Sequence, residues 1–283
     1  MTSDVRTDTA TAGKPNPYEP VPAKLVEVIQ DTPTIKTFVL EPPEPMSFRA
    51  GQFVQLTLPG VGEAPFTPSS SPYHPERIEV TVLRTGKVTD RLHEVEVGAT
   101  LGLRGPFGKG FPLDKLKGRE VLIVGGGVGL APLRALILAL IEKDCGTKRV
   151  SIKYGARTPD ELLYRSSFDE WRSRPNVDVT ETIDREAPGW TGRVGLVTVL
   201  LDDLDLDIPN CYAFTCGPEI MLRFVTLKLV EKGFADDHIY LSMNRKMSCG
   251  MGICGRCNIG PIYLCKDGPD VCYAEVKDYP NLF

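Results

Sequence analysis

Residues 120–157 read EVLIVGGGVGLAPLRALILALIEKDCGTKRVSIKYGAR, and this stretch decides the fold class. It begins with an apolar run, EVLIVGGG, which is typical of a strand that is buried on both faces. A helical segment, APLRALILALIEKD, and a second apolar strand, KRVSIKYGAR, follow it. A strand, a helix and a strand in this order predict a parallel sheet, because parallel neighbours need a crossover connection.

The same alternation continues to residue 233. We expect helices at 161–174, 192–204 and 218–233 and strands at 177–184 and 211–217. Residues 23–113 differ, because short strands with Gly and Pro between them recur there, at 23–30, 35–42, 52–58, 77–83 and 99–108. The predicted fold class is therefore a small antiparallel β-barrel of about six strands, followed by an α/β domain with a doubly wound parallel sheet.

The chain of 283 residues divides into four predicted parts. These are a disordered polar tail at 1–21, the barrel at 22–116, the α/β domain at 117–236 and a short irregular segment at 237–283. The net charge of −4 gives no reason to expect a nucleic-acid partner. No apolar run predicts a membrane span, and the N-terminus lacks the apolar core of an export signal, so we expect a cytoplasmic protein.

Four cysteines lie in the last segment, and they read C-x4-C-x2-C-x7-C: Cys249, Cys254, Cys257 and Cys265. The first three have the spacing of a plant-type iron–sulfur loop, and glycines between them let backbone N–H groups point at sulfur. A structural zinc site is the main alternative, but zinc sites usually pair two C-x2-C units or mix Cys with His. A set of disulfide bonds is the second alternative, but the sequence has no secretory signal that would favour it. The pattern thus favours a 2Fe–2S cluster, which would hold the segment together.

A glycine-rich turn follows the strand at 120–127 and opens a helix: Gly125, Gly126, Gly127 and Gly129. Such a turn lets backbone approach a phosphate and offers free N–H groups at a helix start. It departs from the full G-x-G-x-x-G pattern, so a plain strand–helix turn remains the alternative. Arg157 ends the second strand, where NAD domains carry an acidic residue. It would bind an adenosine 2′-phosphate and favour NADP, unless it is simply a solvated arginine.

Three further segments could form parts of a site. Residues 215–218, TCGP, end a strand where parallel sheets place ligands, although Cys216 alone could be a small buried residue. Residues 65–70, PFTPSS, offer hydroxyl groups around an aromatic ring, and residues 86–89, GKVT, offer a glycine turn. Each of the two barrel segments is most simply a loop, but together they could hold an isoalloxazine ring and a pyrophosphate.

Seven motifs in a fixed order resemble the ferredoxin–NADP reductase superfamily from residue 22 to residue 283: PFTPSSSP, GKVTDRLHE, LRGPFGKGF, VGGGVGLAPLR, YGARTPDELLY, TCGPEIM and CGMGICGRCNIGPIYLCKDGP. Within it, the chain looks like the electron-transfer subunits that carry a flavin and an iron–sulfur cluster. These include the gamma subunit of cytoplasmic NAD(P)-linked nickel–iron hydrogenases (sulfhydrogenases), the electron-transfer subunit of dihydroorotate dehydrogenase B and the B subunit of anaerobic sulfite reductase.

The resemblance implies roles for particular residues. The FAD-binding residues would be Pro65, Phe66, Thr67, Ser69, Gly86, Val88 and Thr89. The nicotinamide nucleotide would lie against Gly126, Gly127, Gly129, Cys216, Gly217 and Pro218. Cys265 would be the fourth cluster ligand, with Cys272 as its rival. The family's flavin motif has an arginine where Ala64 stands here and a serine where Thr67 stands, which leaves open how tightly FAD is held.

The expected activity is hydride exchange between NADP(H) or NAD(H) and FAD, with single electrons passing through the 2Fe–2S cluster to or from a partner. No side chain needs to act as a general acid or base. The first expected partners are the iron–sulfur and nickel–iron subunits of a hydrogenase. Dihydroorotate oxidation, sulfite reduction, a stand-alone flavin reductase and a redox-sensing subunit with a degenerate flavin site are the alternatives.

Overall fold

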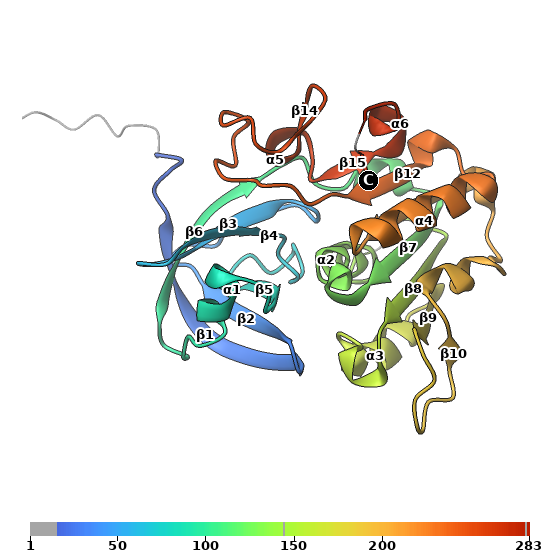
Figure 1. Cartoon of the computed structure of the whole chain (residues 1–283), viewed down its shortest axis with the longest axis horizontal. Coiled ribbons are helices and arrows are strands. Elements are labelled where there is room, and N and C mark those ends of the chain that lie inside the picture. Colours follow the sequence, from blue (N-terminus) through green and yellow to red (C-terminus); the bar gives the residue numbers. More distant parts are fainter. Residues whose placement is uncertain (1–15, 144, 281) are drawn as a thin grey trace, which may run out of the picture.

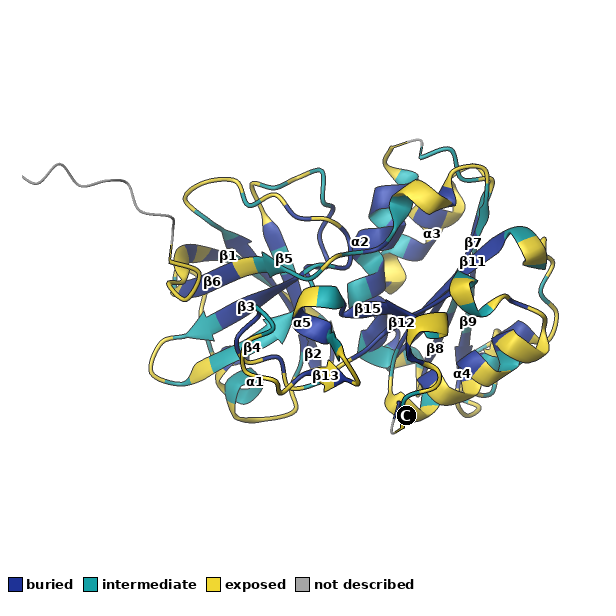
Figure 2. Cartoon of the chain, turned by 90° about the horizontal axis from the view of Figure 1, so that it is seen from above, coloured by how far each residue is buried: buried dark blue, intermediate teal, exposed yellow. Residues whose placement is uncertain are grey.

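The structure is a computed structural model, and it describes residues 16–143, 145–280 and 282–283. The predicted disordered tail lies almost wholly outside the described residues. Two sheets dominate the described residues, an antiparallel one built by residues 21–107 and a mostly parallel one built from residue 120 onward (Figure 1). Their inner faces are buried, and the exposed residues concentrate on loops and outer helix faces (Figure 2).

The first sheet has six antiparallel strands in the order β4-β3-β6-β1-β2-β5, and its two edge strands contact each other. The strands are β1 (Val21–Thr32), β2 (Ile35–Glu41), β3 (Phe53–Leu58), β4 (Gly62–Phe66), β5 (Ile78–Leu83) and β6 (Thr100–Phe107). Fully buried side chains from four of them, Leu25, Phe38, Leu56 and Val80, fill its interior. A short helix, α1 (Lys87–Leu92), follows β5. The predicted barrel is confirmed, and the strand that the sequence did not show is β4, a short edge strand that tolerates Pro65.

The second sheet has the order β10-β9-β8-β7-β11-β12-β15, and only β15 runs antiparallel to its neighbour. Its strands are β7 (Glu120–Gly126), β8 (Arg149–Ala156), β9 (Val177–Ile183), β10 (Arg193–Val194), β11 (Cys211–Cys216), β12 (Ile239–Ser242) and β15 (Asp270–Cys272). Val121 and Ile123 pack on the face that α2 (Leu130–Ile141) covers, while Leu122 and Val124 pack on the face of α4 (Glu219–Glu231). Helices on both faces confirm the doubly wound sheet.

One predicted helix is wrong, and another is much shorter than predicted. Residues 192–204 form strand β10 and the 3-10 turn η5 (Val197–Leu201), because β10 pairs with β9 and Gly195, at a φ of 133°, breaks the chain between them. Residues 161–174 form the turn η4 (Arg165–Ser167) and only a short helix, α3 (Phe168–Arg172), since Tyr164 has a left-handed φ of 57°. The remaining 3-10 turns are η1 (Leu113–Leu116), η2 (Gly127–Gly129), η3 (Pro159–Glu161), η6 (Ile208–Asn210) and η7 (Asp236–His238).

The C-terminal segment joins the two sheets. Its strands β12 and β15 belong to the parallel sheet, and the residues between them form the hairpin β13 (Asn258–Ile259) and β14 (Ile262–Tyr263) and the helix α5 (Leu264–Asp267). This connection lies over the barrel beside β6 (Figure 1), and helix α6 (Tyr273–Val276) follows β15. Among the described residues, none of the helices has the length and apolar character needed to cross a membrane.

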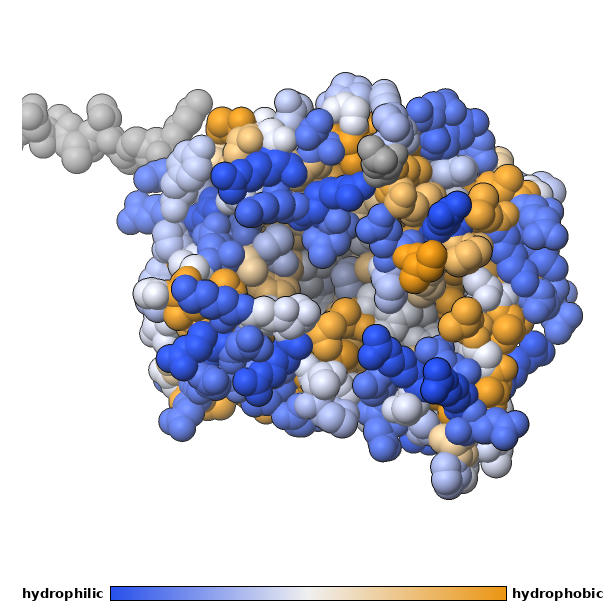
Figure 3. Space-filling model, viewed as in Figure 1, coloured by the Kyte–Doolittle hydropathy of each residue, from blue (hydrophilic) through white to orange (hydrophobic). Residues whose placement is uncertain are grey.

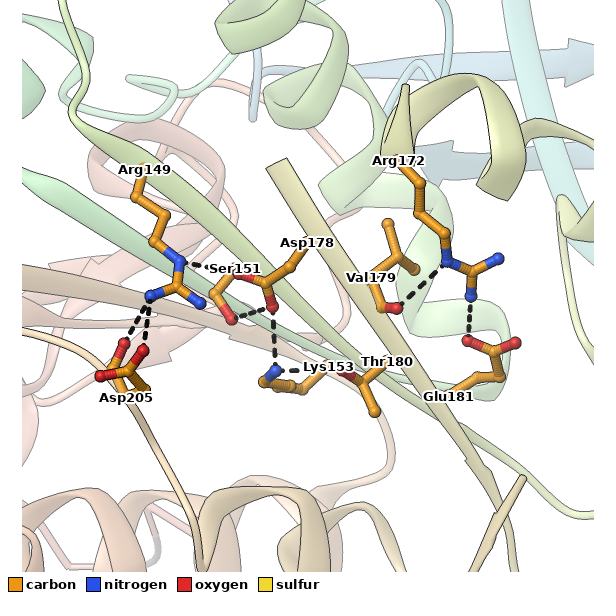
Figure 4. A network of polar contacts seen from close by, with 9 residues as sticks. All are labelled: Arg149, Ser151, Lys153, Arg172, Asp178, Val179, Thr180, Glu181 and Asp205. Carbon is orange, nitrogen blue, oxygen red and sulfur yellow. Dashed lines mark hydrogen bonds and ion pairs between the residues drawn. The ribbon is translucent and has the colours of Figure 1, made fainter. Parts of the chain in front are cut away.

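A charged network ties β8 to β9 (Figure 4). Asp178 accepts hydrogen bonds from Arg149 Nε at 2.9 Å, Ser151 Oγ at 2.8 Å and Lys153 Nζ at 3.0 Å. Burial acts to raise the pKa of Asp178, but the hydrogen bonds from Lys153 and Ser151 outweigh it and hold the pKa below its usual value. The carboxylate on β9 is thus ionised and holds two cations, Arg149 and Lys153, of the neighbouring strand β8.

Asp178→Asn is expected to lower the free energy of unfolding by about 2 kcal/mol at neutral pH, because it leaves the partly buried ammonium of Lys153 uncompensated. The depressed pKa means that this contribution is present above the ordinary pKa of aspartate and is lost as the pH falls through the lowered value. Denaturant unfolding at neutral and acid pH measures both. Asp205→Asn, on an exposed carboxylate that pairs with Arg149, is the control, and an equal loss in both variants would contradict the prediction.

Candidate functional site

A cleft of about 930 Å³ lies between the barrel and the parallel sheet. Its sheet side consists of residues at the carboxyl ends of β7, β8, β11 and β12, and its barrel side consists of the ends of β4 and β5. It opens near the centre of the face shown in Figure 3. The carboxyl edge of a parallel sheet is where open α/β folds bind ligands. The cleft therefore has the position and size of a site for two extended cofactors.

The barrel side brings part of the predicted flavin residues together. Pro65, Phe66, Thr67 and Thr89 line the cleft, whereas Ser69 does not. The Ser69 hydroxyl is fully buried behind the wall and shares a hydrogen bond of 2.8 Å with the Thr81 hydroxyl, which in turn lies 2.6 Å from the Tyr164 hydroxyl. Ser69 thus belongs to a polar contact between the barrel and the α/β domain.

The glycine turn before α1 reaches the cleft through some of its residues. Thr89 Oγ1 accepts hydrogen bonds from the backbone N–H groups of Thr85 and Gly86, both at 2.9 Å. Val88 packs near Gly62 at the start of β4, and neither Gly86 nor Val88 lines the cleft. On this turn the groups that reach the cleft are Arg84, Thr85 and Thr89.

The sheet side brings six predicted residues to one edge of the cleft: Gly126, Gly127, Gly129, Cys216, Gly217 and Pro218. The close approach of β7 and β11 explains one glycine, because a Cβ on Gly129 would stand 2.3 Å from the Cys216 carbonyl oxygen. Burial raises the pKa of the Cys216 thiol to about 12, with the nearby Asp270 carboxyl adding to the shift. Cys216 is therefore a neutral thiol at physiological pH and serves as a contact group in the cleft wall.

Arg157 lies exposed immediately after β8 and lines the cleft. Two acidic residues line the same cleft, Glu161 and Asp184, and Asp184 directly follows β9. The Tyr154 hydroxyl donates to the Gly127 carbonyl oxygen at 3.1 Å and accepts from the Leu163 N–H, which fixes the end of β8 against the glycine turn. The position of Arg157 fits contact with the adenosine half of a dinucleotide.

The four cysteines of the motif lie in the connection between β12 and β15. Cys249 Sγ accepts the N–H groups of Met251 and Ile253 at 3.4 Å, and Cys265 Sγ accepts the Gly252 N–H at 3.0 Å. The thiols interact in two pairs: Cys249 with Cys254, and Cys257 with Cys265. Burial acts to raise the pKa of Cys249, but the backbone hydrogen bonds outweigh it and lower the pKa to about 6.

N–H donors aimed at soft thiolates are what an iron–sulfur cluster requires, so the donor set fits a 2Fe–2S cluster. In the described part of the chain, no three His, Cys, Asp or Glu side chains are already arranged around a common metal position. Cys272 lies elsewhere. It belongs to β15, and its Sγ contacts the Asp236 carbonyl oxygen at 3.7 Å. This arrangement favours Cys265 over Cys272.

Several residues that line the cleft are not predicted from the sequence: Arg84, Asp184, Thr198, Ser242, Asn244 and Met247. Arg84 could have been predicted, because it directly precedes the turn at 85–89, part of which is the predicted FAD-binding segment. For Ser242 and Asn244 the indication in the sequence is weaker. Ser242 ends β12 and Asn244 lies just after it, and the irregular sequence there did not indicate that this strand belongs to the parallel sheet.

Family models match both halves of the chain. Residues 22–111 match the oxidoreductase FAD-binding domain, and residues 123–226 match the oxidoreductase NAD-binding domain. The fold and cleft thus define a flavin- and nicotinamide-dependent oxidoreductase.

Curated relatives extend over nearly the whole chain. It is 33% identical to the sulfhydrogenase 1 subunit gamma of Pyrococcus furiosus, over 94% of this chain and 95% of that protein. It is 35% identical to a probable dihydroorotate dehydrogenase B (NAD(+)) electron transfer subunit of Methanocaldococcus jannaschii, over 89% of each. A chain in the structure of an NADH-dependent reduced ferredoxin–NADP oxidoreductase superposes with a TM-score of 0.74 at 28% identity, covering 92% of this chain and 93% of that one. The chain belongs to the ferredoxin–NADP reductase family and is an NAD(P)H-linked flavin oxidoreductase subunit of the electron-transfer type.

Proposed function

We propose that this chain is the diaphorase subunit of a larger complex. It would exchange hydride with NADP(H) or NAD(H) and pass single electrons to or from a partner iron–sulfur subunit of a nickel–iron hydrogenase, in the cytoplasm. Bound FAD would supply the conversion between two-electron and one-electron chemistry, and a bound 2Fe–2S cluster would supply one-electron transfer. The observation that carries the proposal is the joining of three parts: the flavin and nucleotide segments in one cleft, and the cysteine loop on the barrel beside it.

The protein's own residues would bind and orient. Phe66 and Thr67 would flank the flavin ring, and Gly127, Gly129 and Gly217 would let backbone approach the nicotinamide nucleotide. Arg84 lines the cleft on the turn predicted for the FAD pyrophosphate and is held at 3.2 Å by Asp90. Arg84 would therefore supply the positive charge for the FAD pyrophosphate that the family's motif arginine provides and that Ala64 lacks.

The gamma subunits of sulfhydrogenase support the hydrogenase partner, because they align over at least 91% of this chain. The electron-transfer subunits of dihydroorotate dehydrogenase B support the second candidate, a dihydroorotate-oxidising complex. Anaerobic sulfite reduction and redox sensing remain weaker candidates. A stand-alone flavin reductase has no need for the cysteine loop.

The decisive experiment is an anaerobic titration of the purified chain with NADPH and then NADH, followed by visible absorbance and electron paramagnetic resonance. Bleaching of a flavin band together with a rhombic signal from a reduced 2Fe–2S cluster is expected. A bound chromophore that neither nucleotide reduces would overturn the proposal in favour of a structural or sensory cluster. Copurification with hydrogenase rather than flavin dehydrogenase subunits would decide between the partners.

Arg157→Ala is expected to weaken NADPH binding by about tenfold and NADH binding by much less, because only NADPH carries the 2′-phosphate that a guanidinium pairs with. Dissociation constants for both nucleotides, measured on the flavin-loaded chain, test this. Arg165→Ala, on an exposed arginine that does not line the cleft, is the matched control. Equal losses for NADPH and NADH would show that Arg157 does not read the 2′-phosphate.

A further inference from the structure

A buried ion pair lies directly beneath the cysteine loop. The Arg104 side chain on β6 is only 5% exposed and the Glu63 side chain on β4 is 25% exposed. Arg104 Nε donates to Glu63 Oε2 at 2.8 Å, and Arg104 Nη2 donates to Glu63 Oε1, so the pair is bidentate. Arg104 Nη1 also donates to the Cys249 carbonyl oxygen at 3.4 Å. The guanidinium thus touches the backbone of the first cysteine of the motif.

Other contacts fix the guanidinium in this place. Arg104 Nη1 donates to the Pro17 carbonyl oxygen at 3.0 Å, and its Cζ lies 5.5 Å from the centre of the Phe107 ring. The same ring supports the loop, because a Cβ on Gly250, at a φ of 80°, would stand 2.7 Å from it. Arg104 therefore joins the N-terminal segment, the barrel and the cysteine loop through one planar group.

Both partners of the pair are charged. The hydrogen bond that Arg104 donates to Glu63 raises the pKa of Arg104 and outweighs the opposite effect of burial. Burial acts to raise the pKa of Glu63, but hydrogen bonds from Arg104 and from Thr57 Oγ1, at 2.8 Å, hold it below its usual value. Strand pairing sets this geometry, since Glu63 lies opposite Thr57 and Arg104 lies opposite Gln55 on the two sides of β3.

A fixed charge beside an iron–sulfur site acts on its reduction potential. One-electron reduction adds one negative charge to a site that already carries four thiolates, so a nearby cation stabilises the reduced form and a nearby anion opposes it. Inside the protein, such interactions are screened less than at the surface. Arg104 and Glu63 therefore push the potential in opposite directions.

We propose that Arg104 is a positioning residue for the cysteine loop and that the Arg104–Glu63 pair sets the reduction potential of the cluster, with Arg104 raising it and Glu63 lowering it. The inference rests on the proposed function, because it needs the cluster at the four cysteines. Neither residue lines the nucleotide cleft, so reduction of the flavin by NADPH or NADH should be unchanged when they are replaced.

The test is a redox titration of the full chain monitored by the electron paramagnetic resonance signal of the reduced cluster. In Arg104→Gln, the ratio of reduced to oxidised cluster at a fixed potential is expected to fall about tenfold, a shift of about 59 mV to lower potential for a one-electron couple. In Glu63→Gln, which keeps a hydrogen-bond acceptor for Arg104, the shift is expected to be upward and of similar size. The double variant should return close to the wild-type potential.

Arg104→Lys separates charge from positioning. It keeps the charge, so the potential should stay near that of the wild type. It loses the bidentate contact and the reach to the Cys249 carbonyl, so iron release to a chelator should become several-fold faster.

Shifts in the same direction in Arg104→Gln and Glu63→Gln, or no shift in either, would overturn the inference while the cluster itself stands. An iron-free wild-type chain would overturn both the inference and the proposed cluster. Should Arg104→Gln fail to retain iron, the upward shift in Glu63→Gln decides alone.

Discussion

Cys254→Ser is expected to remove the 2Fe–2S cluster and to leave flavin reduction by NADPH or NADH intact. Cys254 is the exposed member of the four motif cysteines, and its thiol pairs with Cys249. A serine hydroxyl is a hard and weakly acidic ligand, so it replaces a thiolate poorly on iron. The loop packs on the barrel outside the cleft, so loss of the cluster need not disturb the flavin.

The measurement is iron and FAD content of the purified variant, followed by stopped-flow reduction with NADPH. Iron should fall from about two atoms per chain to near zero, because the cluster needs all four cysteines. The flavin band should still bleach at close to the wild-type rate. An intact cluster in the variant would show that Cys254 is not a ligand.

Cys265→Ser and Cys272→Ser form a matched pair that tests the fourth ligand. The first should lose iron, because Cys265 Sγ lies in the loop at 3.0 Å from the Gly252 N–H. The second should keep it, because Cys272 lies in β15 against the Asp236 carbonyl. The opposite result would reassign the ligand set, whatever the outcome for Cys254.

The order of elements could be predicted where local pattern and tertiary structure agree. For β7, the glycine turn and helix α2, the local sequence pattern favours the same structure that the tertiary packing stabilises, so this unit was predicted correctly. Residues 192–204 have an apolar spacing that suits a helix, but pairing of Arg193 and Val194 with β9 and the backbone at Gly195 override it. Helix propensity is a weak predictor where the backbone can instead form hydrogen bonds with an edge strand of a sheet.

The candidate site shows the same division. Motif residues such as Phe66, Gly127 and Cys216 reach the cleft because motifs describe short segments whose backbone geometry is local. The position of Ser69 is not local, since the Thr81 and Tyr164 hydroxyls hold it behind the wall. Likewise, no pattern in the sequence indicates that Arg104 meets Glu63, because that contact depends on how β4 and β6 both pair with β3.

Asp270 is a buried acid with a strongly raised pKa, and its removal is expected to stabilise the protein at neutral and alkaline pH. It is 6% exposed, and neither carboxyl oxygen has a hydrogen-bond partner of normal geometry. Ser242 lies opposite it in the β12–β15 pairing, and the Gly51 backbone packs directly against Oδ2. Burial raises its pKa to about 8, and the Ser242 hydroxyl opposes this only in part.

The sign of the pH effect follows from proton binding. Between the ordinary aspartate pKa and a value of about 8, the folded chain holds a proton on Asp270 that the unfolded chain has released. The free energy of unfolding therefore falls as the pH rises, by about 1.4 kcal/mol per pH unit. Asp270→Asn carries a neutral group of the same shape and removes this dependence. From pH 5 to pH 8 the variant should gain about 4 kcal/mol over the wild type.

Denaturant unfolding at pH 5 and pH 8, followed by the fluorescence of Trp171 and Trp190, measures the difference. Asp278→Asn, on an exposed carboxylate of the same segment, should show the wild-type dependence on pH. A variant of Asp270 that is no more stable than the wild type at pH 8 would mean that the carboxyl is solvated or paired. The expected gain has a structural consequence, because Asp270 lies where β15 meets the barrel residue Gly51. A charge forming there would weaken the contact between the two halves that enclose the cleft.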